Sequence, residues 1–520
     1  MFAATVAGIC ILIGWLWDGS GVSPYVRKVP TASGAKAVQI IWSKKRGHAE
    51  VEHIGSAHDE AELELLTAVA RQRIHAGQDE LDLGLPVGDQ SSVEILGTRM
   101  GRLLDAISAV YRQLGLDTVA GADEVFEQLV TARIIEPTSK QDAARVLEEA
   151  GVTAVSYPTL KRRLPGYASD KFRHGLSGAC AARAELGPSA LLLYDVTTLW
   201  FETDTGDGFR EPGFSKERRL EPQITVGLLT DASGAPLMVD AFEGNTAETR
   251  TMIPIIRAFV EAHGIAGVTV VADAGMMSEA NLKDVEDAGW SFVVGGKLPD
   301  IPYQISQWHR THPGLDPVDQ MILTQPMIMG PNADQRHRTI YYQYRADRAR
   351  RSLHGIDTQV AKAEKAIAGQ AAIKRNRFVT LTGGTKSINR DLEAKVRALA
   401  GWKPYVTNLD ATPEFVIGAY HQLWHVEHSF RMSKHDLRAR PIYSRKRESI
   451  DAHLAVVFAA LAVSQRIEHL TGWTISRFVK TLRRYRTVQI NTGHHTFTAE
   501  QPVPDDIRAA LDRLHQRAGD

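Results

Sequence analysis

Residues 190–202 read ALLLYDVTTLWFE, and this stretch decides the fold that we predict for the chain. A run of apolar and β-branched residues of this length predicts a strand buried inside a sheet. Asp195 interrupts the run. A carboxylate on a buried strand is costly unless it binds a cation or a charged partner. The segment therefore predicts both the centre of a sheet and a candidate site residue.

A second acid has the same setting, because residues 268–275 read VTVVADAG and predict a short buried strand that ends at Asp273. Two further strands are expected at 223–230 and 236–242, joined by a hairpin turn at 231–234. Helices are expected at 248–263 and 278–288, and a last strand at 290–294. The order β-β-β-α-β-α-β is that of a ribonuclease-H-like core, an α/β fold in which the first and fourth strands are neighbours. Asp195 and Asp273 should therefore lie side by side. The ordinary alternative for each is an acid that caps a turn or pairs with an arginine.

A third acid is expected on a helix at 413–434. Tyr420, Glu427 and Lys434 are spaced by seven residues, nearly two helical turns, so they share one face. This stripe places a carboxylate between two groups that can hold phosphates, although an ordinary solvated face has the same spacing. His421 and His425, at i and i+4, leave open a zinc site with Glu427 as third ligand.

Residues 420–434, YHQLWHVEHSFRMSK, resemble the Y-R-E-K signature of insertion-sequence DDE transposases, in the insertion-sequence-four-like superfamily. Tyr420, Glu427 and Lys434 fit its spacing, whereas Leu423 stands where the signature has arginine. The blocks YDVTT and VVADAG are similar to those around the family's first two acids. The order of the blocks, from about Tyr25 to Ile467, is more specific than any one motif.

The resemblance implies that Asp195, Asp273 and Glu427 are catalytic and coordinate two Mg²⁺ (or Mn²⁺) ions, and that Tyr420 and Lys434 contact DNA. It implies cutting at terminal inverted repeats and joining to target DNA, in a synaptic complex that is expected to be a homodimer. A bacterial cytoplasmic protein without a membrane segment fits this activity. Two alternatives stay open: a related nuclease that does not join ends, and a DNA-binding regulator descended from a transposase.

A helix-turn-helix is predicted before the core. Ser139 is expected to cap one helix and Ser156 a second, with Gly151 between them. The second helix carries Lys161, Arg162 and Arg163, which would face DNA. Two surface helices of a bundle would give the same pattern.

Composition constrains the class of protein only weakly. The 520 residues contain 61 basic and 61 acidic side chains, with 43% hydrophobic residues, which is ordinary for a globular chain. Basic residues are nevertheless concentrated at 336–377, with 11 Lys or Arg against 3 acids, and at 431–447, with 7 against 1. Two cysteines, Cys10 and Cys180, exclude a disulfide framework and fit a reducing compartment.

We expect six regions along the chain. Residues 1–22 include an apolar stretch that we interpret as preceding the natural start, with a signal anchor as the alternative. The regions are a small α/β unit at 1–90, a helical DNA-binding region at 91–185, the first part of the ribonuclease-H-like core at 186–297, an insertion with β-strands at 298–412, the rest of the core at 413–470 and a basic helical tail at 471–520.

Overall fold

In the computed structural model, the chain divides into two compact units, residues 1–90 and 91–520. Residues 1–22 lie outside the described residues, so the interpretation of the chain start stays a prediction. The described residues are 24–31, 35–45, 48–57, 59–75, 94–184, 186–187, 190–213, 220–265, 267–329, 335–370, 376–382, 385–440, 442, 444–491 and 496–516.

The first unit is a three-stranded antiparallel sheet with one helix. Strand β2 (Lys36–Lys45) is central and pairs antiparallel with β3 (His48–Ala57) on one side and with β1 (Tyr25–Pro30) on the other. Helix α2 (Glu60–His75) packs on this sheet through a small core around Val38, Ile40 and Leu63.

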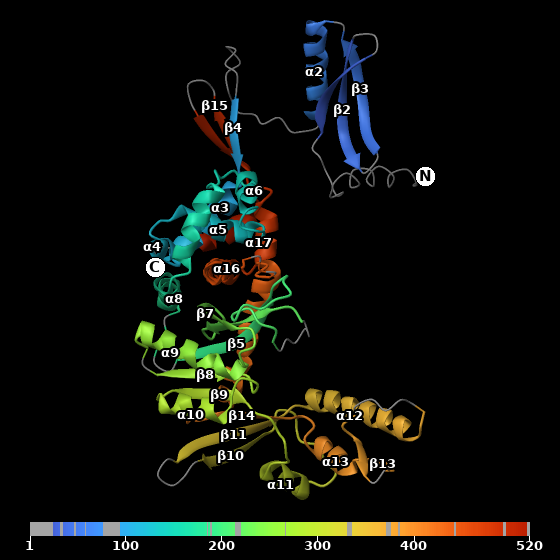
Figure 1. Ribbon diagram of the computed structural model, residues 1–520, viewed down its shortest axis with the longest axis vertical. Coiled ribbons are helices and arrows are strands. Elements are labelled where there is room, and N and C mark those ends of the chain that lie inside the picture. The colour runs from blue at the N-terminus through green and yellow to red at the C-terminus, as the bar shows by residue number, and fades with distance from the viewer. Residues whose placement is uncertain are drawn as a thin grey trace, which may run out of the picture. The chain divides into compact units, whose positions relative to one another are not determined.

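The centre of the second unit is an eight-stranded mixed sheet in the order β10-β11-β14-β9-β8-β5-β6-β7 (Figure 1). Its five core strands are those predicted from the sequence: β5 (Ala190–Trp200), β6 (Gln223–Thr230), β7 (Pro236–Glu243), β8 (Val268–Ala272) and β9 (Ser291–Gly295). Strands β5, β8 and β9 run parallel, whereas β6 and β7 are antiparallel to their neighbours. This order and these directions confirm the ribonuclease-H-like core.

Helices cover both faces of the sheet. Helices α9 (Met252–His263) and α10 (Glu279–Asp287), with the short η1 (Glu248–Arg250), lie on the face that carries Leu192, Tyr194 and Val270. The opposite face carries Leu193 and Val271, which pack in one core with three later helices. These helices are α14 (Pro413–His421), α15 (Leu423–Arg431) and α16 (Arg447–Thr471).

Residues between β9 and β14 extend the same sheet. Strand β14 (Trp402–Thr407) pairs antiparallel with β9, and β11 (Arg336–Tyr344) and β10 (Ile322–Met329) continue outward. Around them lie α11 (Tyr303–Thr311), α12 (Ala346–Ile367), β12 (Val379–Thr382), β13 (Thr385–Ile388) and α13 (Arg390–Ala398).

The prediction of helix from about 93 onward was wrong at its start, because residues 94–99 form β4 (Glu94–Arg99). The tail expected to be helical at 471–520 has the helices α17 (Ile475–Leu482) and α18 (Asp505–Gln516), but it also contains two strands. β4 pairs with β15 (Thr487–Asn491), which in turn pairs with β16 (Thr496–Glu500). The partners are almost 400 residues apart in sequence, and local periodicity carries no information about such pairing. The other helices of these regions are α3 (Gly101–Gln113), α4 (Leu116–Ala120), α5 (Glu124–Ile135), α6 (Ala143–Glu149), α7 (Tyr157–Tyr167) and α8 (Asp170–Arg183).

The predicted helix at 413–434 is interrupted. The chain turns at Gln422 between α14 and α15, and α15 passes into the π-helical turn η2 (Met432–Asp436). A straight helix was therefore the wrong template for the stripe of Tyr420, Glu427 and Lys434. A π turn contains an extra residue per turn, and this changes the direction of the side chains that follow Arg431, Lys434 among them.

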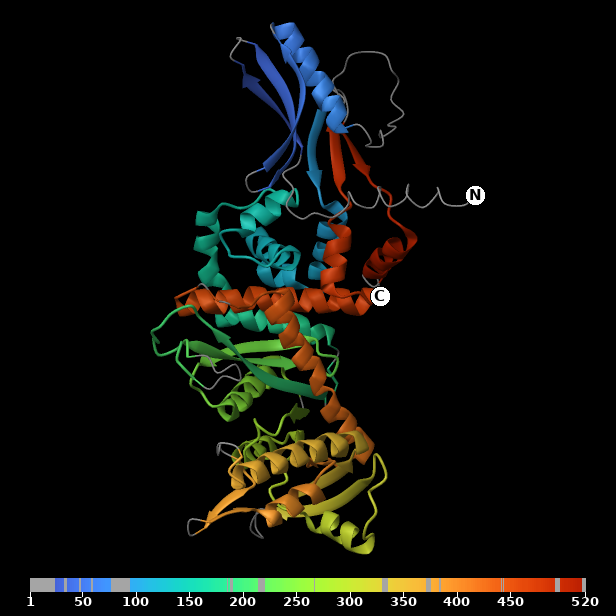
Figure 2. The same ribbon diagram turned by 90° about the vertical axis from the view of Figure 1, so that its right-hand side faces the viewer.

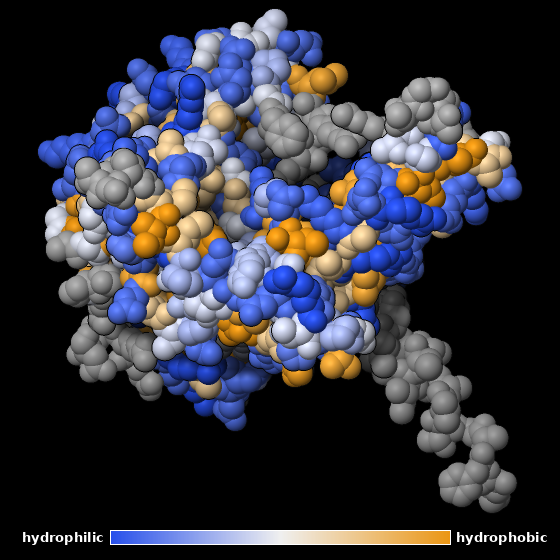
Figure 3. Space-filling view, turned by 90° about the horizontal axis from the view of Figure 1, so that it is seen from below, coloured by the Kyte–Doolittle hydropathy of each residue, from blue (hydrophilic) through white to orange (hydrophobic). Residues whose placement is uncertain are grey.

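Helix α16 lies between the sheet and the N-terminal helices of this unit (Figure 2). It is apolar nearly all round and packs against α5 and α7 on one side and β7 on the other. By length and composition it is the one helix among the described residues that could cross a membrane, but 83% of its apolar window is buried inside the protein. Such burial is typical of a core helix. On the face shown in Figure 3, hydrophobic residues lie in separate patches among hydrophilic ones, as on an ordinary protein surface.

One buried ion pair joins the outer part of the sheet to the core. Arg338 on β11 is 3% exposed and donates from Nε to Glu286 Oε1 of α10 at 2.9 Å. We predict that Arg338→Met lowers the free energy of unfolding by about 1 to 3 kcal/mol, because Glu286 loses its partner Arg338 and keeps only Arg336, at 3.2 Å. Urea unfolding measures this loss. Arg350→Met, which removes an exposed pair with Asp347, is the matched control and should have little effect. Equal stability of the two variants would contradict the prediction.

Candidate active site

The pairing of β5 with β8 places the first two acids at the same level of the sheet. The parallel register joins Leu193 to Val271, and the same register continued by two residues brings Asp195 opposite Asp273. Side chains two residues apart on a strand share a face. Asp195 and Asp273 therefore belong to the face that carries Leu193 and Val271, which is covered by α14, α15 and α16. The expected neighbourhood of the two strands is confirmed.

A side chain of helix α14 fixes the position of Asp273. Tyr420 of α14 donates its hydroxyl hydrogen to Asp273 Oδ1 at 2.7 Å, and the backbone N–H of Ala274 donates to the same oxygen at 2.8 Å. Burial raises the pKa of Tyr420, and the adjacent Asp273 raises it further, so the phenol stays protonated as a donor. Tyr420, the first residue of the predicted stripe, thus contacts Asp273, the second predicted acid.

A basic side chain lies beside Tyr420 and Asp273. The ammonium of Lys403, on β14, lies 4.0 Å from the centre of the Tyr420 ring. Burial lowers the pKa of Lys403, while the charges of Asp273 and Glu427 oppose that shift. Lys403 was not singled out from the sequence, because a single lysine on a strand has no local signal that distinguishes it from a solvated one.

A cavity of about 650 Å³ brings the other two acids together. Asp195 and Glu427 both line it, and so do Lys434 of η2, Arg431 and His435. Lys434 thus reaches the same space as Glu427 despite the π turn. The wall is completed by hydroxyl and amide side chains, among them Thr197, Thr198, Thr225, Asn245 and Thr246.

A third carboxylate on this cavity, Glu248, was missed by the sequence analysis. It is the first residue of η1 and lines the wall that Asp195 and Glu427 share. A Cβ added to Gly275, two residues after Asp273, would lie 3.7 Å from Glu248 Oε2, so the Asp273 loop passes close to this carboxylate. An acid in a first helical turn is common, so its sequence position alone carried no functional signal.

The carboxylates are not gathered as a finished metal centre. In the part of the chain that the structure describes, no three His, Cys, Asp or Glu side chains lie close enough together to hold a metal ion. The zinc alternative with His421 and His425 has no such group either. His425 packs on Gly234 of the β6–β7 turn, and His421 Nε2 lies 3.4 Å from the Tyr405 hydroxyl. The assignment of Asp195, Asp273 and Glu427 as metal ligands stays a prediction.

The predicted recognition helix is α7. Ser156 caps it by accepting from Thr159 N at 3.4 Å, and Pro158 occupies its first turn. The expected cap at Ser139 was wrong, because α6 begins later and its N-cap is Asp142. Ser139 Oγ accepts from Asp142 N at 3.1 Å and so stabilises the turn that leads into α6. Three basic side chains on α7 are exposed and do not line the cavity described above. They are Lys161, Arg162 and Arg163, the last of which lies 3.9 Å from Asp123.

Among the comparisons with known proteins, a family model assigns the chain to one family. The family model of the transposase DDE domain matches residues 187–463 of this chain. No curated protein matches the chain. A piggyBac transposase in a synaptic complex with hairpin DNA is similar to 76% of this chain, over 72% of its own length, with 9% identity and a TM-score of 0.38. The fold assignment rests on the strand order and not on this likeness.

The hydrogen bond between Tyr420 and Asp273 is open to measurement. We predict that Tyr420→Phe lowers the free energy of unfolding by about 1 to 2 kcal/mol, because it removes a bond to a charged acceptor and keeps the ring. Tyr405→Phe is the matched control. Its hydroxyl makes contacts of 3.4 Å with Gln343 and His421, and its loss should cost less. If denaturant unfolding ranks the two variants the other way, Tyr420 does not hold Asp273 as described.

Proposed function

Because the chain belongs to the transposase DDE-domain family, we propose that it cuts double-stranded DNA at the terminal inverted repeats of a mobile element and joins the ends to target DNA. The register that sets Asp195 opposite Asp273 supports this proposal most strongly. Glu427 and Asp195 on one cavity of about 650 Å³ add a space that can admit a phosphodiester group. We assign the chain to the Y-R-E-K branch through Tyr420, Glu427 and Lys434.

Divalent cations are part of the proposal. Asp195, Asp273 and Glu427 would hold Mg²⁺ (or Mn²⁺), for which carboxylate oxygens are suitable ligands. The donor set fits, because two of these carboxylates share a cavity and the third follows the neighbouring strand. When bound, two such ions activate the attacking oxygen and stabilise the leaving one. Glu248 supplies a further oxygen donor on the same wall.

The other side chains of the site would orient the acids and the DNA. Tyr420 fixes one oxygen of Asp273 through its hydroxyl. Lys434 and Arg431 add positive charge to a cavity that otherwise repels phosphates, because its carboxylates carry negative charge. Leu423 replaces the arginine of the signature and is buried, so any phosphate contact of that arginine must come from another residue, for which Lys403 is our candidate.

Sequence-specific binding would come from outside the cavity. We propose that α7 presents Lys161, Arg162 and Arg163 to base edges, as the second helix of a helix-turn-helix does. The exposed basic residues of α12 would add contacts to the DNA backbone. Action on two transposon ends at once implies a homodimer, and the expected setting is the bacterial cytoplasm.

We predict that Asp195→Asn reduces DNA cleavage by roughly a thousandfold, because the substitution keeps the shape of the carboxylate and removes the charge. Binding of transposon-end DNA should be nearly unchanged. Single-turnover cleavage and a gel-shift assay on the same duplex measure the two effects. Asp284→Asn removes a charge from the exposed face of α10 and is the matched control.

The same assays separate the alternatives. Wild-type cleavage by the Asp195→Asn protein would remove this residue from the site. Cleavage by the wild-type protein without joining of a pre-cut end would identify a nuclease. Binding of DNA without any metal-dependent cleavage would identify a regulator.

A further inference from the structure

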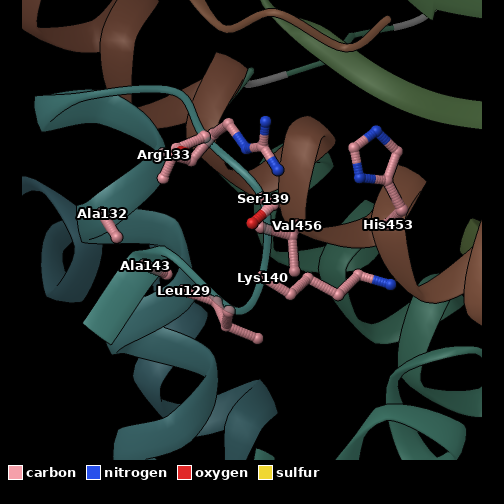
Figure 4. A pocket seen from close by; sticks show the side chains of 9 residues that line it. Leu129, Ala132, Arg133, Ser139, Lys140, Ala143, His453 and Val456 are labelled. Carbon is pink, nitrogen blue, oxygen red and sulfur yellow. The ribbon is translucent and has the colours of Figure 1, made fainter. Parts of the chain in front are cut away.

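Three basic side chains converge on a small cavity outside the catalytic site (Figure 4). Arg133 comes from α5, Lys140 from the turn before α6, and His453 from α16. Thr138 and Ser139 complete the polar part of the wall. Because the Thr138–Lys140 turn is half-buried, the cavity lies close to the surface.

The partners of these basic groups are neutral. Arg133, which is 8% exposed, donates from Nη1 to the carbonyl oxygens of Leu437 and Arg438, both at 3.4 Å. Lys140 Nζ donates to Ser444 Oγ at 2.9 Å and to the Ser449 carbonyl at 3.2 Å. Among the residues that the structure describes, no carboxylate forms an ion pair with Arg133, Lys140 or His453.

The cluster carries net positive charge near neutral pH. Burial lowers the pKa of Lys140 to about 8 and that of His453 to about 3, and the neighbouring Arg133 contributes to both shifts. Lys140 is therefore largely protonated at pH 7, whereas His453 is neutral and can donate from Nε2 to the Ala439 carbonyl at 3.0 Å. Two cations thus lie close together with only neutral partners. Such burial costs several kcal/mol unless an anion compensates it.

The small volume of the cavity limits how much of an anion can enter it. Its volume of about 10 Å³ holds roughly one water-sized group. A phosphate would therefore insert a single oxygen and keep its other oxygens outside. Ser139 Oγ accepts from Asp142 N, and its own hydrogen can be donated to an inserted oxygen.

The surroundings of the cavity indicate a polyanion. The residues that bond to Arg133 and Lys140 belong to the segment 437–449, which follows the helix that carries Glu427. Arg438, Arg445 and Lys446 of this segment are exposed. Arg438 adopts a left-handed backbone with φ of 41°, and Arg133 binds its carbonyl oxygen.

We propose that this pocket binds one oxygen of a DNA backbone phosphate, with Arg133, Lys140 and Ser139 as its donors and the exposed arginines of 437–449 beside it. DNA bound here is fixed relative to the segment that leads from Glu427 to α16. The identity of the polyanion rests on the proposed function, whereas the affinity of the pocket for a phosphate group does not.

The test compares Lys140→Met with Lys171→Met, which removes an exposed lysine on α8. The first measurement is the melting temperature in sodium phosphate against sodium chloride at equal ionic strength. Phosphate should raise it by several degrees more for the wild-type protein and Lys171→Met than for Lys140→Met. The second is the affinity for a random-sequence duplex as a function of salt. Lys140→Met should bind about tenfold more weakly, with a salt slope smaller by about one charge.

Each outcome decides the proposal. A lost phosphate effect with unchanged DNA affinity means that the pocket holds a free anion, and this overturns the DNA assignment. A phosphate effect that Lys140→Met keeps, with or without a change in DNA affinity, means that Lys140 only joins the turn to α16, and this overturns the pocket. If Lys140→Met does not fold, Lys140→Gln keeps a donor for the Ser449 carbonyl and replaces it in both measurements. Neither measurement requires cleavage, so both remain informative if Asp195 proves dispensable.

Discussion

The parallel pairing of β5 with β8 is the constraint on which the rest of the site depends. It sets Asp195 and Asp273 at one level of the sheet and on one face. Strand β8 ends at this level, whereas β5 continues and pairs with β6. That face is covered by α14 and α15, so the helix layer must present its polar side chains to the two acids. Tyr420 contacts Asp273, and Glu427 lines the cavity of Asp195. A shift of one residue in the β5–β8 register would turn one acid to the opposite face and separate the pair.

Helix α16 connects this site to the N-terminal helices. It is buried on the side of the sheet and on the side of α5. Its residue His453 holds the segment that follows Glu427 through a hydrogen bond to the Ala439 carbonyl. The same helix therefore stabilises the core and holds a positively charged surface near the chain that carries the third acid. A substitution in α16 would affect both, which makes Lys140 a more selective probe than His453.

The core and the positions of Asp195 and Asp273 on neighbouring strands could be predicted because their signals are local. An apolar run that contains Asp195 and another that ends at Asp273 predict central strands. The order of strands and helices predicts the ribonuclease-H-like core. Pairing across long sequence distances could not be predicted, as β4 with β15 and β9 with β14 illustrate. Glu248 and Lys403 were missed for the same reason. Each looks like an ordinary surface charge in sequence and acquires its setting only when distant segments meet. The π turn at Lys434 was also invisible, because spacing was interpreted on an ideal α-helix.

The central claim is that Asp195, Asp273 and Glu427 bind catalytic cations together. A crystal of the protein soaked with Mn²⁺ and measured at the manganese absorption edge tests it most directly, because the anomalous signal locates the ion itself. Our account predicts at least one peak within about 2.0 to 2.5 Å of oxygens from these carboxylates. It also predicts that Asp273 turns toward that peak from its bond with Tyr420. Full occupancy at His421 and His425, with no peak beside Asp195, would contradict it.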